Sequence, residues 1–217
     1  MVATKKMQNK ITAAAKDVLL APVYLYQGHK IKRDTVRLPE PNGERHGQVQ
    51  LNNSPITSKG KSNNILNLMV VGDSAAAGVG SQTQQEALVG HLIPILTEQA
   101  AIQSAFDTLN WSLQATTGYT SFDILRRLYV LPAPSQPIDV MVLSVGVNDT
   151  TSKVSAAQWQ QQIENIIAIA QRKFGVRELV FLSLPPMAQM PAIPVPLNNF
   201  VGAKAAILDN SLQQICA

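Results

Sequence analysis

The chain has 217 residues, of which 46% are hydrophobic and 15% are charged. This length and composition suit one globular domain with a sizeable core, and they exclude a disordered chain. No apolar run approaches the ~20 residues that a membrane-spanning helix needs. The single cysteine, Cys216, excludes an internal disulfide framework.

The net charge of +4 is distributed unevenly along the chain. Residues 1–61 contain 11 of the 18 basic residues and 4 of the 14 acidic ones, a net charge of +7, whereas residues 62–217 carry 7 basic and 10 acidic residues, a net charge of −3. Such a basic segment is typical of a solvated arm, or of weak peripheral contact with an anionic membrane. Its only aromatic residues are Tyr24 and Tyr26, which argues against nucleic acid as a partner.

The first 26 residues do not fit a secretory signal peptide. Lys16 and Asp17 interrupt the segment before its short apolar run, 18–26, and the only A-x-A arrangement, 13–15, precedes that run instead of following it. We therefore expect a cytoplasmic or peripherally membrane-associated protein rather than a secreted one, with the exact compartment left open. An amphipathic anchoring segment is an alternative for this region.

The composition and the hydrophobic pattern of the sequence change near residue 65. Residues 27–64 are rich in Gly, Pro, Asn and charge, and they predict an irregular stretch. From Ile65 onward, strand and helix patterns alternate. We therefore divide the chain into a basic, irregular lead-in, 1–64, and an α/β domain, 65–217.

The α/β domain contains four strand–helix units in succession. Strands are predicted at 65–71, 109–116, 139–146 and 178–184, and helices at 83–102 (kinked at Pro94), at 121–131, after Ser155 and at 198–215. This alternation predicts an open parallel sheet with helices on both faces.

Polar and small residues follow three of these strands, and ligands of open parallel sheets bind beyond the carboxyl ends of the strands. Ser74 follows the first strand, Gly118 the second and Asn148 the third. A serine at this edge can attack an acyl carbon. The backbone N–H groups of Ser74 and Gly118 and the side-chain amide of Asn148 would then stabilise the negative charge on the carbonyl oxygen. Each residue alone also suits a turn or a cap.

Three blocks that contain these residues, VVGDSAAAGVG, TTGYTSFDIL and VLSVGVNDTT, resemble the first three blocks of the SGNH, or GDSL, hydrolase family. The resemblance extends over roughly residues 18–215. It implies Ser74 as nucleophile and Gly118 and Asn148 as oxyanion donors. It also implies a flavodoxin-like three-layer α/β/α sandwich with a parallel sheet, esterase or lipase activity on a small-molecule carboxylic ester, and no metal or cofactor.

The chain departs from the family at its C-terminal end. The family's last block, Asp-x-x-His, supplies the general base, and here no histidine follows His91. We therefore expect a C-terminally incomplete domain that lacks its last edge strand, from a shortened gene or a fragment, with little activity. His29, His46 and His91 are weak alternatives as the base. Asp73 and Asp149, with ordinary pKa values near 4, are poor bases.

Two other functions are compatible with the pattern. A non-catalytic acyl- or carbohydrate-ester-binding remnant of the same fold would explain the missing base. A phosphate or nucleotide site is disfavoured, because no lysine follows the glycines after Ser74 and no G-x-G-x-x-G is present. The sequence does not identify the acyl group, the alcohol or the oligomeric state. The apolar segment 187–197 is either one wall of an acyl pocket or a rigid crossover.

Overall fold

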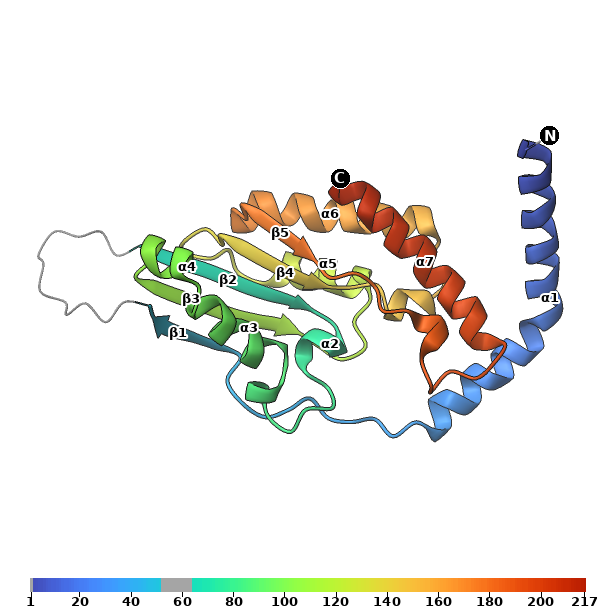
Figure 1. Ribbon diagram of the computed structural model, residues 1–217, viewed down its shortest axis with the longest axis horizontal. Coiled ribbons are helices and arrows are strands. Elements are labelled where there is room, and N and C mark those ends of the chain that lie inside the picture. The colour runs from blue at the N-terminus through green and yellow to red at the C-terminus, as the bar shows by residue number, and fades with distance from the viewer. Residues whose placement is uncertain (1, 52–63) are drawn as a thin grey trace, which may run out of the picture.

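The computed structural model describes residues 2–51 and 64–217, with side chains from residue 15 onward. Its centre is a five-stranded sheet in the order β1-β3-β2-β4-β5 (Figure 1). The strands are β1 (His46–Gln50), β2 (Ile65–Gly72), β3 (Thr108–Ala115), β4 (Val140–Ser144) and β5 (Glu178–Phe181). β1 pairs antiparallel with β3, and all the other pairs are parallel.

Helices cover both faces of this sheet. The helical elements are α1 (Val2–Asp34), α2 (Ser74–Ala77), η1 (Gln84–Glu86), α3 (Leu88–Thr97), α4 (Ala100–Ala105), α5 (Ser121–Val130), η2 (Asn148–Thr150), α6 (Ala156–Phe174), η3 (Met187–Gln189) and α7 (Leu197–Cys216). Helices α5, α6 and α7 contribute to the core on one face of the sheet, and α2 and α3 to the core on the other.

The two cores are separated by the alternation of side chains along the central strands. In β2, Met69 and Val71 are buried against α5, α6 and α7, whereas Leu68 and Val70 are buried on the α2 and α3 side. A strand that is apolar on both faces is typical of a parallel sheet covered on both sides. The predicted three-layer α/β/α sandwich is confirmed, as are its four strands.

The order of the parallel strands places a crevice at the centre of the sheet. After β2 the chain adds β3 on one side, then crosses to add β4 on the other. Counted from β2, this is the beginning of the flavodoxin-like order, in which ligands bind where the chain changes direction. Figure 1 shows the arrowheads of the parallel strands pointing to the side of the molecule where α2 lies.

The irregular lead-in predicted for residues 27–64 is wrong at residues 27–34 and 46–50, whereas residues 35–45 form neither helix nor strand, as predicted. Helix α1 continues to Asp34, and residues 46–50 form β1, which pairs with β3. Edge strand β1, HGQVQ, contains one apolar side chain, Val49, so it carries almost no strand pattern. Because β1 belongs to the sheet, the boundary at residue 64 does not separate two structural units. The rest of the predicted stretch, 52–63, lies outside the described residues.

The predicted helix 83–102 is divided into η1, α3 and the start of α4. Pro94 lies inside α3, which continues to Thr97, and the break falls beyond it at Glu98 and Gln99. An interior proline removes one i→i−4 hydrogen bond and its ring crowds the carbonyl four residues earlier, which favours a kink. Helix α3 nevertheless continues for three residues beyond Pro94.

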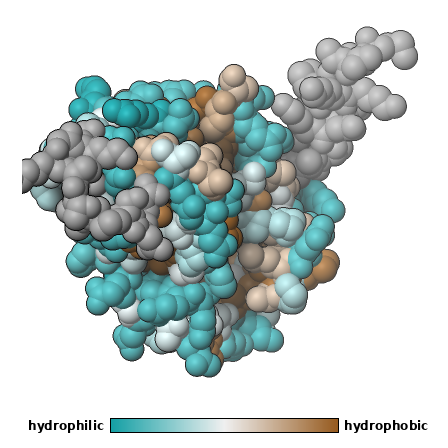
Figure 2. Space-filling view, turned by 60° about the vertical axis from the view of Figure 1, so that its left-hand side comes forward, coloured by the Kyte–Doolittle hydropathy of each residue, from teal (hydrophilic) through white to brown (hydrophobic). Residues whose placement is uncertain are grey.

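The surface outside the cores is mostly polar. Figure 2 shows a mainly hydrophilic face on which hydrophobic residues are scattered. Among the described residues, no helix combines the length and the apolarity that crossing a bilayer requires.

Candidate active site

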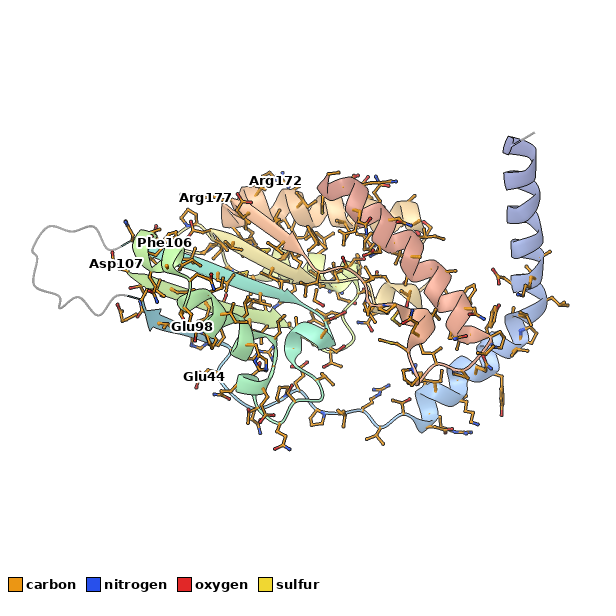
Figure 3. All side chains as sticks on the ribbon, viewed as in Figure 1. Glu44, Glu98, Phe106, Asp107, Arg172 and Arg177 are labelled. Atoms are coloured by element: carbon orange, nitrogen blue, oxygen red, sulfur yellow. The ribbon has the colours of Figure 1, made fainter. Side chains whose placement is uncertain are left out.

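The carboxyl ends of β2, β3 and β4 lie side by side. Gly72, the last residue of β2, is in register with Ala115 of β3 on one side and with Ser144 of β4 on the other. Ser74, Gly118 and Asn148 follow these three strand ends by two, three and four residues. The structure therefore brings the three predicted site residues to the same edge of the sheet. Of the side chains labelled in Figure 3, Phe106, Asp107 and Arg177, which precede β3 and β5, mark the opposite edge.

Hydrogen bonds join the three loops to one another. The Thr116 N–H donates to the Gly72 carbonyl at 3.1 Å, and the Asp73 N–H donates to the Ser144 carbonyl at 3.2 Å. The Asn148 side-chain amide donates to the Tyr119 carbonyl at 2.9 Å. Each loop is thus held by a neighbour, so the positions of the three site residues depend on one another.

Ser74 is the first residue of α2, and the turn before it is tightly built. The Asp73 carboxylate caps the helix by accepting from the Ala75 N–H at 3.1 Å, and its same oxygen accepts from the Ser144 hydroxyl at 3.1 Å. A Cβ at Gly72 would lie 2.7 Å from the Ser144 carbonyl oxygen, so only glycine fits there. Ser74 itself is half-buried, and its hydroxyl makes no hydrogen bond within the described part of the chain.

Gly118 lies in the exposed turn after β3, with φ +83°. This left-handed conformation is costly for any residue with a Cβ. A Cβ at this position would meet no atom within 4 Å. The backbone conformation, and not crowding, is therefore what requires glycine here.

Asn148 begins η2 and is half-buried. A carboxamide has two N–H donors, and the bond to Tyr119 uses one of them. The second N–H is left for another acceptor. The bond to Tyr119 also orients the amide relative to the turn that carries Gly118.

Two buried aspartates, Asp73 and Asp149, hold loops of the site in place through hydrogen bonds. Burial raises the pKa of the Asp73 carboxyl, although the hydrogen bonds from Ala75 and Ser144 oppose this shift, and one of its oxygens has no partner. Burial also raises the pKa of Asp149, against hydrogen bonds from the Ser121 N–H and hydroxyl at the start of α5. Both carboxyls are engaged with helix starts. The ordinary pKa values expected for them from the sequence are wrong, because burial raises both.

The sequence did not reveal a pair of charged residues from the lead-in that holds the Gly118 turn. One Glu40 oxygen accepts from the Thr117 N–H at 2.7 Å and from the Thr117 hydroxyl at 2.9 Å. The other oxygen pairs with Arg45 at 2.9 Å, and the Arg45 guanidinium also donates to the Ala115 carbonyl. We call Glu40 and Arg45 the loop brace. Burial tends to raise the pKa of Glu40, but the Thr117 hydrogen bonds and Arg45 outweigh it and lower that pKa.

No histidine is bonded to Ser74 among the described residues. His29 is exposed on α1, His46 is exposed at the start of β1, and His91 is exposed on α3. Within the described part of the chain, none of the three histidines is therefore placed to take the proton of the Ser74 hydroxyl directly. The described residues also contain no group of three or more His, Cys, Asp or Glu side chains placed to hold a metal ion.

Comparison with known proteins assigns the family. The sequence model of the GDSL-like lipase/acylhydrolase family matches residues 70–217. The chain belongs to this family. The match covers all three loops of this GDSL-family site, and the resemblance seen in the three sequence blocks is thereby confirmed. Comparison with curated proteins gave no match.

Solved structures share the fold of this GDSL-family chain. LAE5, an alpha/beta hydrolase from the metagenome of Lake Arreo, is 14% identical with a TM-score of 0.51, over 71% of this chain and 73% of that one. A lipolytic G-D-S-L protein from Veillonella parvula is 14% identical with a TM-score of 0.50, over 70% and 74%. A mutant of Axe2, an acetyl-xylooligosaccharide esterase from a Geobacillus, is 13% identical with a TM-score of 0.50, over 72% and 74%. At these identities the likeness concerns the fold alone.

The loop brace predicts a pH-dependent contribution to stability. Because the pKa of Glu40 is lowered on folding, its contribution is present above the ordinary value of 4.5 and is lost as the pH falls through the folded-state pKa. We expect Glu40→Gln to lower the free energy of unfolding by about 1–2 kcal/mol at pH 7, and by less in acid. Denaturant titrations across a pH series measure this, with Glu44→Gln, an exposed neighbour, as control. A loss that does not change with pH would contradict the brace.

The turn conformation predicts opposite effects of alanine at two glycines. Neither Gly118 nor Gly28 has an atom within 4 Å of the added Cβ, but only Gly118 has positive φ. Gly118→Ala should lower the free energy of unfolding by about 1–2 kcal/mol because of backbone strain. Gly28→Ala, inside α1, should raise helix stability by about 0.5–1 kcal/mol. Denaturant titration and circular dichroism compare the two, and equal stability of wild type and Gly118→Ala would refute the strained turn.

Proposed function

We propose that this GDSL-family chain acts on carboxylic esters, with Ser74 as the nucleophile. The observation that carries the proposal is the convergence of the Ser74, Gly118 and Asn148 loops on the aligned ends of three neighbouring strands. The Ser74 hydroxyl is partly exposed and unbonded among the described residues. It also lies beyond the strand ends where the chain changes direction, which is where this type of sheet binds ligands.

In this proposal, three N–H groups donate hydrogen bonds to the oxygen of the ester carbonyl. The backbone N–H groups of Ser74 and Gly118 have no partner within the described part of the chain, and the Asn148 amide has one N–H left. Donors that are unpaired before the substrate binds need no rearrangement to stabilise the charge that develops. Removing one such donor typically costs about 3–4 kcal/mol of transition-state stabilisation.

The reaction has two steps. The Ser74 oxygen bonds to the carbonyl carbon, the ester C–O bond breaks, and the alcohol leaves with a proton; water then releases the acid from Ser74. The hydroxyl proton needs an acceptor in the first step, and no histidine is bonded to Ser74. We therefore propose that this 217-residue chain turns over esters slowly, with solvent taking the proton.

A second candidate function follows from the same observation. A fold that holds oxyanion donors next to a serine without a base would bind acyl or carbohydrate esters without cleaving them. This alternative predicts affinity for an ester analogue and no product. Turnover experiments separate the two.

We expect slow hydrolysis of p-nitrophenyl acetate that depends on Ser74. Ser74→Ala should lower the rate above the buffer background at least tenfold, because the acyl acceptor is lost. Ser104→Ala, which changes an exposed serine on α4, should leave the rate unchanged. The measurement is release of p-nitrophenol, with circular dichroism to verify folding.

Equal rates for wild type and Ser74→Ala would overturn the assignment of Ser74 as nucleophile. Fast turnover that Ser74→Ala abolishes would instead show that a base is present and overturn the proposed slow reaction. Binding of an ester analogue with no product at all would favour the binding module.

A further inference from the structure

Helix α1 packs on the body of the protein through one face only. The half-buried side chains on this inner face include Tyr24, Gln27 and Ile31, spaced as one side of a helix requires. The Tyr24 ring stacks on Phe200 with centroids 4.8 Å apart. The Gln27 amide donates to the Val195 carbonyl at 2.7 Å. The docking of α1 is therefore specific.

Residues 18–26 present an apolar outer face of α1 that is exposed and packs on none of the described core clusters. Val18, Leu19, Leu25 and Tyr26 are 76%, 80%, 76% and 69% exposed. Val18 and Leu25, like Leu19 and Tyr26, are seven residues apart, so the four side chains lie on one side of the helix over two turns. We call these four residues the outer stripe. Burial in the core does not explain them, since none of them packs against it.

The segment that carries the outer stripe is positively charged. Residues 1–34 carry seven Lys and Arg residues against two acidic residues, Asp17 and Asp34. Lys16 and Lys32 are exposed, and Lys32 follows Leu25 by seven residues, so it continues the same side of the helix. Both acidic residues are already engaged, Asp17 by the Tyr24 hydroxyl at 3.1 Å and Asp34 by Arg33 at 2.7 Å. The net charge of residues 1–34 is +5, since the bond from the neutral Tyr24 hydroxyl leaves the charge of Asp17 in place.

Helix α1 lies at the edge of the molecule that carries the candidate site. Its residues Tyr24 and Ile31 pack against a buried cluster that includes Met187 and Leu197. Val147, which directly precedes Asn148, packs against the same cluster. Figure 1 likewise shows the docked part of α1 beside the start of α7, on the side to which the strands point. A surface bound by α1 would therefore lie near the strand ends.

We propose that the outer stripe of α1 binds the surface of an anionic lipid bilayer. An apolar stripe flanked by cations is the pattern of a helix that lies in the membrane interface, with apolar side chains among the acyl chains and cations at the headgroups. Charge complementarity favours anionic lipid over a second copy of this chain, because two α1 helices would each bring the same positive charge. This binding does not depend on Ser74; only its consequence, access of the site to lipid esters, rests on the proposed function.

The test is flotation of the full chain with lipid vesicles, using Ser74→Ala so that no lipid is hydrolysed. We expect binding to vesicles that contain phosphatidylglycerol, weak binding to phosphatidylcholine alone, and loss of binding as salt is raised. The double variant Leu19→Glu with Leu25→Glu should bind at least tenfold more weakly. Lys32→Glu should weaken binding to the anionic vesicles only.

The matched control is Ile95→Glu, at a residue of α3 that is 57% exposed; it should bind as the parent does. Circular dichroism verifies folding, and Lys32→Glu alone tests the proposal if the double variant does not fold. No binding of the parent to phosphatidylglycerol vesicles would overturn the proposal. Vesicle binding that the outer-stripe variants leave unchanged would also overturn it. A third contradicting result is a dimer, seen by size-exclusion chromatography, that the double variant dissociates, together with no binding of the parent to vesicles.

Discussion

Strand β2 is paired in parallel on both sides, with β3 and with β4, and this pairing sets the position of everything at the candidate site. Because Gly72 is in register with both Ala115 and Ser144, the three loops that follow begin at adjacent points. A shift by one residue in either pairing would turn buried residues such as Val70 and Val71 toward the wrong core. The two apolar cores thus fix the register, and the register fixes the site.

Hydrogen bonds between the loops also fix their positions at this edge of the sheet. Asp73 links the turn before Ser74 to Ser144, and Asn148 links its own loop to Tyr119 beyond Gly118. Glu40, from a segment outside the parallel strands, binds Thr117 in the same turn. A candidate site assembled from three strand ends and a distant brace is sensitive to changes far from Ser74, since each support orients a different loop.

The sequence was most informative where hydrophobic pattern and local turn chemistry agree. The strands around Val70 and Leu143 are apolar on both faces, and Ser155 with Gln158 forms the capping box expected of α6. Strand β1 was missed because HGQVQ offers only Val49 to a pattern search. The Glu40–Thr117 contact was missed because it joins residues 77 positions apart, and nothing local to either residue signals it. The inner face of α1 was missed for the same reason, since its partners lie on α7 and in the segment before it.

The central claim is that Ser74, Gly118 and Asn148 converge on one oxygen atom. A crystal structure of the protein with phenylboronic acid tests it most directly, because boron bonds to a serine oxygen as a tetrahedral adduct and releases a proton. The account predicts boron on the Ser74 oxygen, with one boronate oxygen within about 3 Å of the Ser74 N, the Gly118 N and the Asn148 Nδ2. An adduct whose oxygens contact neither Gly118 nor Asn148 would contradict it.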